Sequence, residues 1–224
     1  KYTTGLQQRL NHRHNGIRIK IPEALACRNS IKTVFRIRNI FRCQNFVFDI
    51  GTTCNIAISK FEENHDDPTT CGINDINANG NGSLMRILPI AYYAIEKKLK
   101  EYEILELVRQ ISSITHAHEI SIMACYFYVR YVIFLLNGKD KYSAYSMARC
   151  VDYAMFKTET QEAFNRLINE DISKLKVNDI KSTGYVVDTL EATLWVTLKS
   201  ENYKEAIIGA INLGGDTDTI GALT

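Results

Sequence analysis

Apolar residues recur every three or four positions along most of this chain, the spacing that places them on one face of an α-helix. The pattern begins near Gly51 and is interrupted by short polar segments rich in Gly, Asn, Ser and Thr. No segment alternates apolar and polar residues in the way that predicts a β-strand. We therefore predict an all-α fold, a many-helix bundle with a cleft formed by loops at one end. The predicted helices cover residues 51–61, 83–93, 102–114, 120–136, 143–156, 158–172, 185–198 and 203–211.

The longest apolar segment covers residues 120–136. It contains Arg130 and is short for a membrane span, so we predict a helix of the protein core. Asn137 and Gly138 follow it, and a glycine at this position predicts a left-handed helix cap. Pro89 lies close enough to the start of its predicted helix to be tolerated in the first turn.

Charge is distributed unevenly along the 224 residues. The formal net charge of +2 gives no reason to predict a nucleic-acid or membrane partner. Residues 1–46, however, contain ten Lys or Arg residues and a single acidic residue, Glu23. We predict that 1–46 is an atypical basic segment and that 47–224 is the helical domain. The six cysteines include no C-x-x-C pair, which favours reduced thiols in a cytoplasmic protein.

Two carboxylates and a hydroxyl gather near the last residues of the chain. Asp216, Asp218 and Thr219 follow two glycines that predict a tight turn. Oxygen ligands of this kind suit Mg²⁺, so the cluster is a candidate metal site. Alternatively, the glycines end one helix and Asp216 or Thr217 caps the next by accepting a hydrogen bond from free N–H groups. The residues by themselves leave both interpretations open.

A second polar cluster precedes the helix predicted at residues 83–93. Its Asn-Gly repeat exposes backbone N–H groups directly before a helix N-terminus, an arrangement that suits a phosphate. The guanidinium of Arg86 would add a positive charge and two parallel N–H donors to this site. The alternative is an ordinary loop with Ser83 as helix cap and Arg86 paired with an acidic residue of the core.

Two further residues, His116 and Tyr185, are candidates for ligand contact. His116 and His118 lack the additional Cys or His that a zinc site needs, so both suit helix capping or the core, and His116 alternatively suits a hydrogen bond donated to a ligand. Tyr185 follows Gly184 and would either stack on a flat ring or pack in the core.

Taken together, these segments resemble the motifs of the ADP-ribosylglycohydrolase family in order and in residue type. The resemblance covers most of the chain, and it is the combination that is specific rather than any single motif. The matching segments are 48–51, 80–87, 115–116, 184–192 and 212–222.

The resemblance implies an all-α hydrolase with a binuclear Mg²⁺ or Mn²⁺ centre that removes ADP-ribose from modified proteins or from small ADP-ribose adducts. It implies that Asp216, Asp218 and Thr219 are metal ligands and that Asp216 and Asp218 are catalytic. It also implies that the ADP-ribose site near the ribose and phosphates is lined by Asn81, Gly82, Ser83 and Met85. His116 would contact the ligand, and Gly184 and Tyr185 would lie near its adenosine end.

The chain departs from the family pattern at both ends. Residues 1–46 contain no Asp, whereas the family has an acidic residue and a Thr-Asp-Asp-Thr cluster in that region. The pair Asp66-Asp67 is followed by Pro68 and predicts a solvated turn instead. The chain also ends within the last motif, as expected of a truncated domain. A binding module without catalysis and a purely structural protein are therefore the alternative functions.

Overall fold

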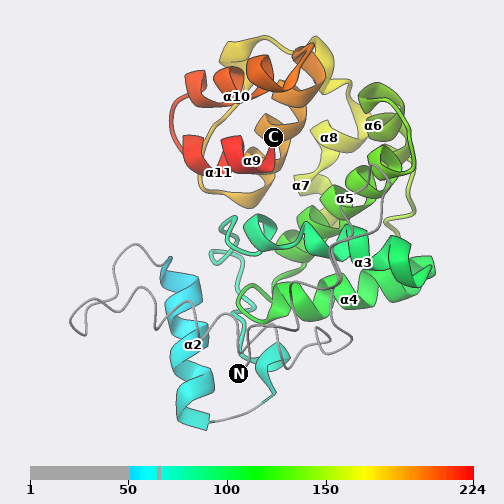
Figure 1. Cartoon of the computed structure of the whole chain (residues 1–224). Coiled ribbons are helices and arrows are strands. Elements are labelled where there is room, and N and C mark those ends of the chain that lie inside the picture. The colour runs from blue at the N-terminus through cyan, green and yellow to red at the C-terminus, as the bar shows by residue number, and fades with distance from the viewer. Residues whose placement is uncertain (1–50, 65–66) are drawn as a thin grey trace, which may run out of the picture.

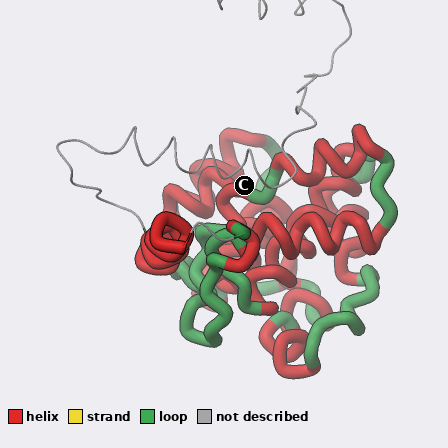
Figure 2. Tube along the Cα trace, turned by 90° about the horizontal axis from the view of Figure 1, so that it is seen from below, coloured by secondary structure: helices red, strands yellow, loops and turns green. Residues whose placement is uncertain are grey.

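The computed structural model describes residues 51–64 and 67–224 and confirms the predicted all-α class. Helices connected by loops make up the described residues, which contain no β-strand (Figure 2). The segment 1–46 and residues 48–50 of the first motif lie outside them. The elements are α2 (Thr52–Asn64), η3 (Pro68–Thr70), η4 (Leu84–Arg86), α3 (Pro89–Lys97), α4 (Glu101–Ser113), α5 (Glu119–Leu136), α6 (Lys141–Arg149), α7 (Thr158–Ala163), α8 (Asn165–Asn169), η5 (Ile172–Lys174), η6 (Val177–Asp179), α9 (Val186–Lys199), α10 (Tyr203–Asn212) and α11 (Thr217–Leu223).

Helix α5 forms the centre of the core, as its continuous apolar sequence predicts. It packs against α3, α4, α6 and α9. By length and composition α5 is apolar enough to cross a membrane, but most of its side chains are buried inside the fold. Gly138 follows it with φ of +82°, which confirms the predicted left-handed cap.

A second group of helices lies around α9. Helices α9, α10 and α11 pack together at the same side of the molecule as the last residue (Figure 1). Their shared apolar residues are Ala192, Val196, Ala206, Ala210 and Ile220. Helix α9 therefore belongs to both groups, because it also packs on α5.

Three of the predicted helices are shorter or more divided than the sequence pattern indicates. The helix predicted at 83–93 is a 3₁₀ turn, η4, followed by α3, which begins at Pro89 because proline has no N–H to donate. The helix predicted at 143–156 ends at Arg149. The helix predicted at 158–172 is divided into α7 and α8 at Phe164, whose side chain is fully buried.

Candidate active site

The Asn-Gly loop and the start of α9 are joined through their main chains. Asn81 N–H donates to Gly184 O over 3.0 Å, and Val186 N–H donates to Asn79 O over 3.0 Å. Gly80 and Tyr185 form an isolated antiparallel bridge between them. Two motifs that are about a hundred residues apart in the sequence therefore lie side by side.

Asn81 connects this pair of segments to the acidic cluster. Its Nδ2 donates to Asp216 Oδ2 over 2.6 Å and to Thr189 Oγ1 over 2.9 Å. Gly184 also lies close to Asp216, since a Cβ added to Gly184 would be 3.7 Å from Asp216 Oδ2. The structure thus places Gly184 beside the carboxylate of Asp216.

Asp216 occupies the N-cap position of α11, but the predicted capping hydrogen bond is absent. Its carboxylate faces Asn81 instead. Partial burial raises the pKa of Asp216. Hydrogen bonds from Asn81 and Thr219 lower it by more, so the pKa lies below the ordinary value. Asp216 therefore carries a full negative charge at neutral pH, next to the carboxyl group of Asp218.

The cluster has the chemistry of a divalent cation site. Two carboxylates side by side repel each other unless a cation neutralises them, and Mg²⁺ often takes one or two carboxylates and completes its shell with water. Thr219 Oγ1 lies 3.8 Å from Met85 Sδ, so the 3₁₀ turn η4 borders the same cluster. Among residues 51–64 and 67–224 no third His, Cys, Asp or Glu joins the two aspartates.

Two glycines with positive φ place Asp216. Gly214 and Gly215 have φ of +74° and +65°, a region that L-residues with a Cβ rarely adopt. Asp216 N–H donates to Ser182 O over 3.2 Å, and the Ser182 hydroxyl donates to Gly214 O. The turn is thereby attached to the segment that leads into α9.

His116 lies beneath the Asn-Gly loop and is almost fully buried. A Cβ added to Gly82 would lie 3.0 Å from His116 Cε1, and one added to Gly80 would lie 3.6 Å from its Nε2. The Asn-Gly loop approaches the imidazole closely because both of these residues lack a side chain. Burial and the charge of Arg86 lower the pKa of His116 to about 4, so the ring is neutral at neutral pH.

We expect acid to destabilise the fold through His116. Its folded pKa of about 4 lies below the ordinary value of about 6.5, so the unfolded state binds more protons between these values. The contribution to stability is complete above about pH 6.5 and is lost as the pH falls toward 4. Urea unfolding of wild type and His116→Gln at pH 7 and pH 4.5 measures it.

The His116→Gln variant should lose less stability than wild type on acidification. His118→Gln is the comparison, because His118 also has a lowered pKa but is more exposed. Equal acid sensitivity in wild type and His116→Gln would contradict the assignment.

The structure contradicts the predicted cap by Ser83 and the predicted ion pair of Arg86, whereas a phosphate contact of Arg86 stays a prediction. The Arg86 guanidinium donates to the carbonyl oxygens of Gly82, Ile111 and Ser112 and to Thr115 Oγ1, and pairs with no acidic residue among those that the structure describes. Its charge therefore stabilises the C-terminal end of α4. Ser83 makes no side-chain cap and is fully buried, with its Oγ accepting from Cys125 Sγ.

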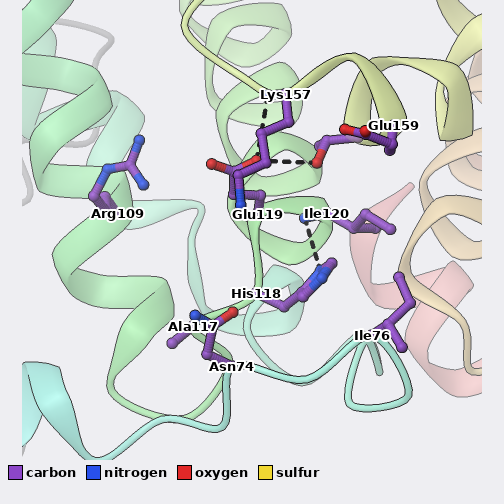
Figure 3. Close-up of a pocket in the computed structure, with 10 residues that line it drawn as sticks. Asn74, Ile76, Arg109, Ala117, His118, Glu119, Ile120, Lys157 and Glu159 are labelled. Atoms are coloured by element: carbon purple, nitrogen blue, oxygen red, sulfur yellow. Dashed lines mark hydrogen bonds between the residues drawn. The ribbon is translucent and has the colours of Figure 1, made fainter.

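A separate pocket lies beside His118. It has a volume of about 260 Å³ and is bordered by His118, whose Nδ1 accepts from Ile120 N–H and so caps α5 (Figure 3). Asn79 links this pocket to the Asn-Gly loop, since its Nδ2 lies 3.0 Å from His118 Nδ1. The lining residues are Asn74, Ile76, Arg109, Ala117, His118, Glu119, Ile120, Lys157, Glu159 and Thr160.

Asn79, Thr189 and Cys54 also belong to this site, although the sequence pattern does not single them out. Thr189 lies inside the matching segment 184–192 and Asn79 directly precedes the segment 80–87, but nothing in residue type separates them from their neighbours. Cys54 on α2 would be 3.2 Å from a Cβ on Gly82. Tyr185 and Met85 are accessible at the surface, as ligand contacts require, and their roles stay predictions.

The comparisons with known proteins agree with this arrangement of motifs. A family model for ADP-ribosylglycohydrolase matches residues 12–224. The chain belongs to the ADP-ribosylglycohydrolase family. The predicted family is therefore confirmed, whereas the division at residue 46 stays a prediction.

Curated ADP-ribosylglycohydrolases resemble most of the chain at about 30% identity. The ADP-ribosylarginine hydrolase Tri1 of Pseudomonas putida (strain GB-1) is 31% identical over 182 residues, which cover 78% of this chain and 44% of that protein. The ADP-ribosyl-[dinitrogen reductase] glycohydrolase of Rhodospirillum rubrum is 30% identical over 176 residues, which cover 78% of this chain and 52% of that protein. The chain thus spans about half the length of these relatives.

A solved structure shares the fold. A chain of an ADP-ribosylglycohydrolase-related protein complex superposes with a TM-score of 0.64 at 22% identity, covering 86% of this chain and 59% of that one. The fold of an ADP-ribosylglycohydrolase is therefore present in the residues that the structure describes.

Proposed function

We propose that this chain is the hydrolytic part of an enzyme that removes ADP-ribose from modified arginine side chains of proteins. Relatives named as an ADP-ribosylarginine hydrolase and an ADP-ribosyl-[dinitrogen reductase] glycohydrolase support this substrate class. The observation that carries the proposal is the contact of Asn81 with Asp216, which joins the family's second and last motifs in one cluster.

The reaction cleaves the bond at C1″ of the distal ribose, through a transition state with oxocarbenium character. Asp216 and Asp218 would hold Mg²⁺ or Mn²⁺, with Thr219 at the border of the site. A bound cation would supply orientation of the ribose hydroxyls and activation of a water molecule. Asn81 keeps Asp216 in place, and a carboxylate of the pair would take the proton of the attacking water. The C1″–N bond breaks with its electron pair on the guanidino nitrogen, and the released arginine then takes up a proton.

The pocket beside His118 supports a position for the other end of ADP-ribose. It lies along the same loop as Asn81, and Asn79 joins the two regions. An extended ligand with its distal ribose at Asp216 would follow the loop toward Ile76. Ile76 is 60% exposed, so its side chain is available for an apolar contact.

We expect Ile76→Asp to weaken binding of ADP-ribose about tenfold, because it replaces an apolar contact with a charge that repels phosphate. Isothermal titration calorimetry with ADP-ribose measures the effect. Val177→Asp is the matched control, since Val177 is 53% exposed on η6 and does not line the pocket. Equal affinity of the two variants would remove the pocket from the proposal.

The function is tested by release of free ADP-ribose from an ADP-ribosylated arginine peptide with excess Mg²⁺. Release that depends on Mg²⁺ supports the hydrolase. Binding of ADP-ribose without release would favour the binding module, and the absence of both would favour the structural protein.

A further inference from the structure

The Thr189 hydroxyl fixes a direction in the hydrogen-bond network of the candidate active site. Thr189 lies in the first turns of α9 and is fully buried. Its Oγ1 lies 2.9 Å from Thr183 O, which can only accept, so the single hydroxyl hydrogen of Thr189 is donated there. Toward Asn81, Thr189 Oγ1 can therefore only accept.

This direction determines which end of the Asn81 amide faces Asp216. The group of Asn81 that contacts Thr189 Oγ1 must be a donor, and the carboxylate of Asp216 also requires a donor. Both requirements are met by Nδ2, whose two hydrogens are then used. Turning the amide over would place Asn81 Oδ1 against a lone pair of Thr189 and a carboxylate oxygen, and both contacts are repulsive.

The same arrangement leaves Asn81 with a single unused group. Its Oδ1 has no hydrogen bond with the residues from 51–64 and 67–224, and it points away from Asp216 because Nδ2 points toward it. A carbonyl oxygen held in this way accepts from a hydroxyl or water but cannot donate.

We propose that Thr189 is a positioning residue that orients the Asn81 amide, so that Nδ2 holds Asp216 and Oδ1 presents an acceptor to a ribose hydroxyl of the substrate. The part that concerns the ribose rests on the proposed function. The part that concerns the Asn81 orientation rests only on contacts within the chain. Thr189 also attaches Thr183, and with it the turn that carries Gly184, to α9.

Helix α9 provides a matched control for the test. Thr193 lies one turn after Thr189 and is also buried, but its hydroxyl has no hydrogen-bond partner among the described residues. Thr189→Val and Thr193→Val therefore make the same change of shape on the same helix. Only the first of them removes a hydroxyl from the network, and Thr189→Ser keeps that hydroxyl.

The first readout is the side-chain NH₂ of Asn81 in a ¹⁵N–¹H correlation spectrum, identified as the signal lost in Asn81→Ala. We expect two protected amide hydrogens in wild type, Thr189→Ser and Thr193→Val. In Thr189→Val the signal should shift and exchange faster with water. An unchanged Asn81 signal in Thr189→Val would overturn the proposal, as would its loss in Thr189→Ser or Thr193→Val.

The second readout is kinetic. We expect Thr189→Val to lower kcat for ADP-ribose release about 10- to 100-fold, the effect of losing a hydrogen bond that positions a charged group. Thr193→Val and Thr189→Ser should stay within about twofold of wild type. If wild type releases no ADP-ribose, the proposed function fails, while the Asn81 signal still decides whether Thr189 orients the amide.

Discussion

Gly215→Ala is expected to destabilise the protein by about 3 kcal/mol and to abolish ADP-ribose release. A residue with a Cβ pays about 1–2 kcal/mol to adopt the left-handed conformation found at Gly215. The added Cβ would also lie 1.9 Å from Ser182 O, and relieving this overlap costs about 1–3 kcal/mol more. Because Ser182 O accepts from Asp216 N–H, the relief must move the aspartate. Urea unfolding and release of ADP-ribose measure the two effects.

Gly214→Ala separates conformational strain from overlap. Gly214 has a similar φ of +74°, but a Cβ there would meet no atom within 4 Å. We therefore expect a loss of only about 1–2 kcal/mol, with ADP-ribose release largely retained. If the two variants lost equal stability and equal activity, the close approach to Ser182 O would not matter.

Asp218→Ala is expected to lower the rate of ADP-ribose release by about a thousandfold or more. The exposed carboxylate of Asp218 lies next to Asp216, and we propose that both hold the catalytic cation. A cation of this kind supplies several kcal/mol of transition-state stabilisation, and each 1.4 kcal/mol is about tenfold in rate. Stability should change little, because the side chain is exposed and removing one of two adjacent negative charges relieves repulsion.

Metal binding gives an independent measure of the same site. Titration with Mn²⁺ should show saturable binding in wild type and much weaker binding in Asp218→Ala. Asp152→Ala is the control, since Asp152 is also exposed but lies in the loop after α6. Full activity or unchanged Mn²⁺ binding in Asp218→Ala would show that Asp218 is not a ligand.

Residue types alone do not show whether Asp216 caps a helix or binds a metal ion. Capping and metal binding both use a short oxygen-bearing side chain after a turn, so Asp216 suited either role. Its carboxylate instead accepts from Asn81, a residue 135 positions away, and makes no cap. A contact over that separation depends on how α9 and α11 pack, which local sequence does not contain.

The hydrogen-bond partners of Arg86 are a second feature that local sequence does not reveal. Its position in a matching motif suggested either a phosphate contact or an ion pair. The folded chain brings the end of α4 to it, and four oxygens of that region and the Asn-Gly loop accept its hydrogens. The last carbonyl oxygens of a helix have no partner within that helix and therefore accept hydrogen bonds from a guanidinium, and the packing of α4 brings them to Arg86.

Local sequence is enough to predict the helical class, the central apolar helix, the left-handed cap at Gly138 and the family. These follow from periodicity, composition and short motifs, which are local properties. The tertiary structure decided which polar groups meet. It placed Asn81 against Asp216, used Thr189 to orient Asn81, buried Ser83 and opened the pocket beside His118. Such contacts join segments far apart in the chain, and their geometry is set by helix packing rather than by any residue alone.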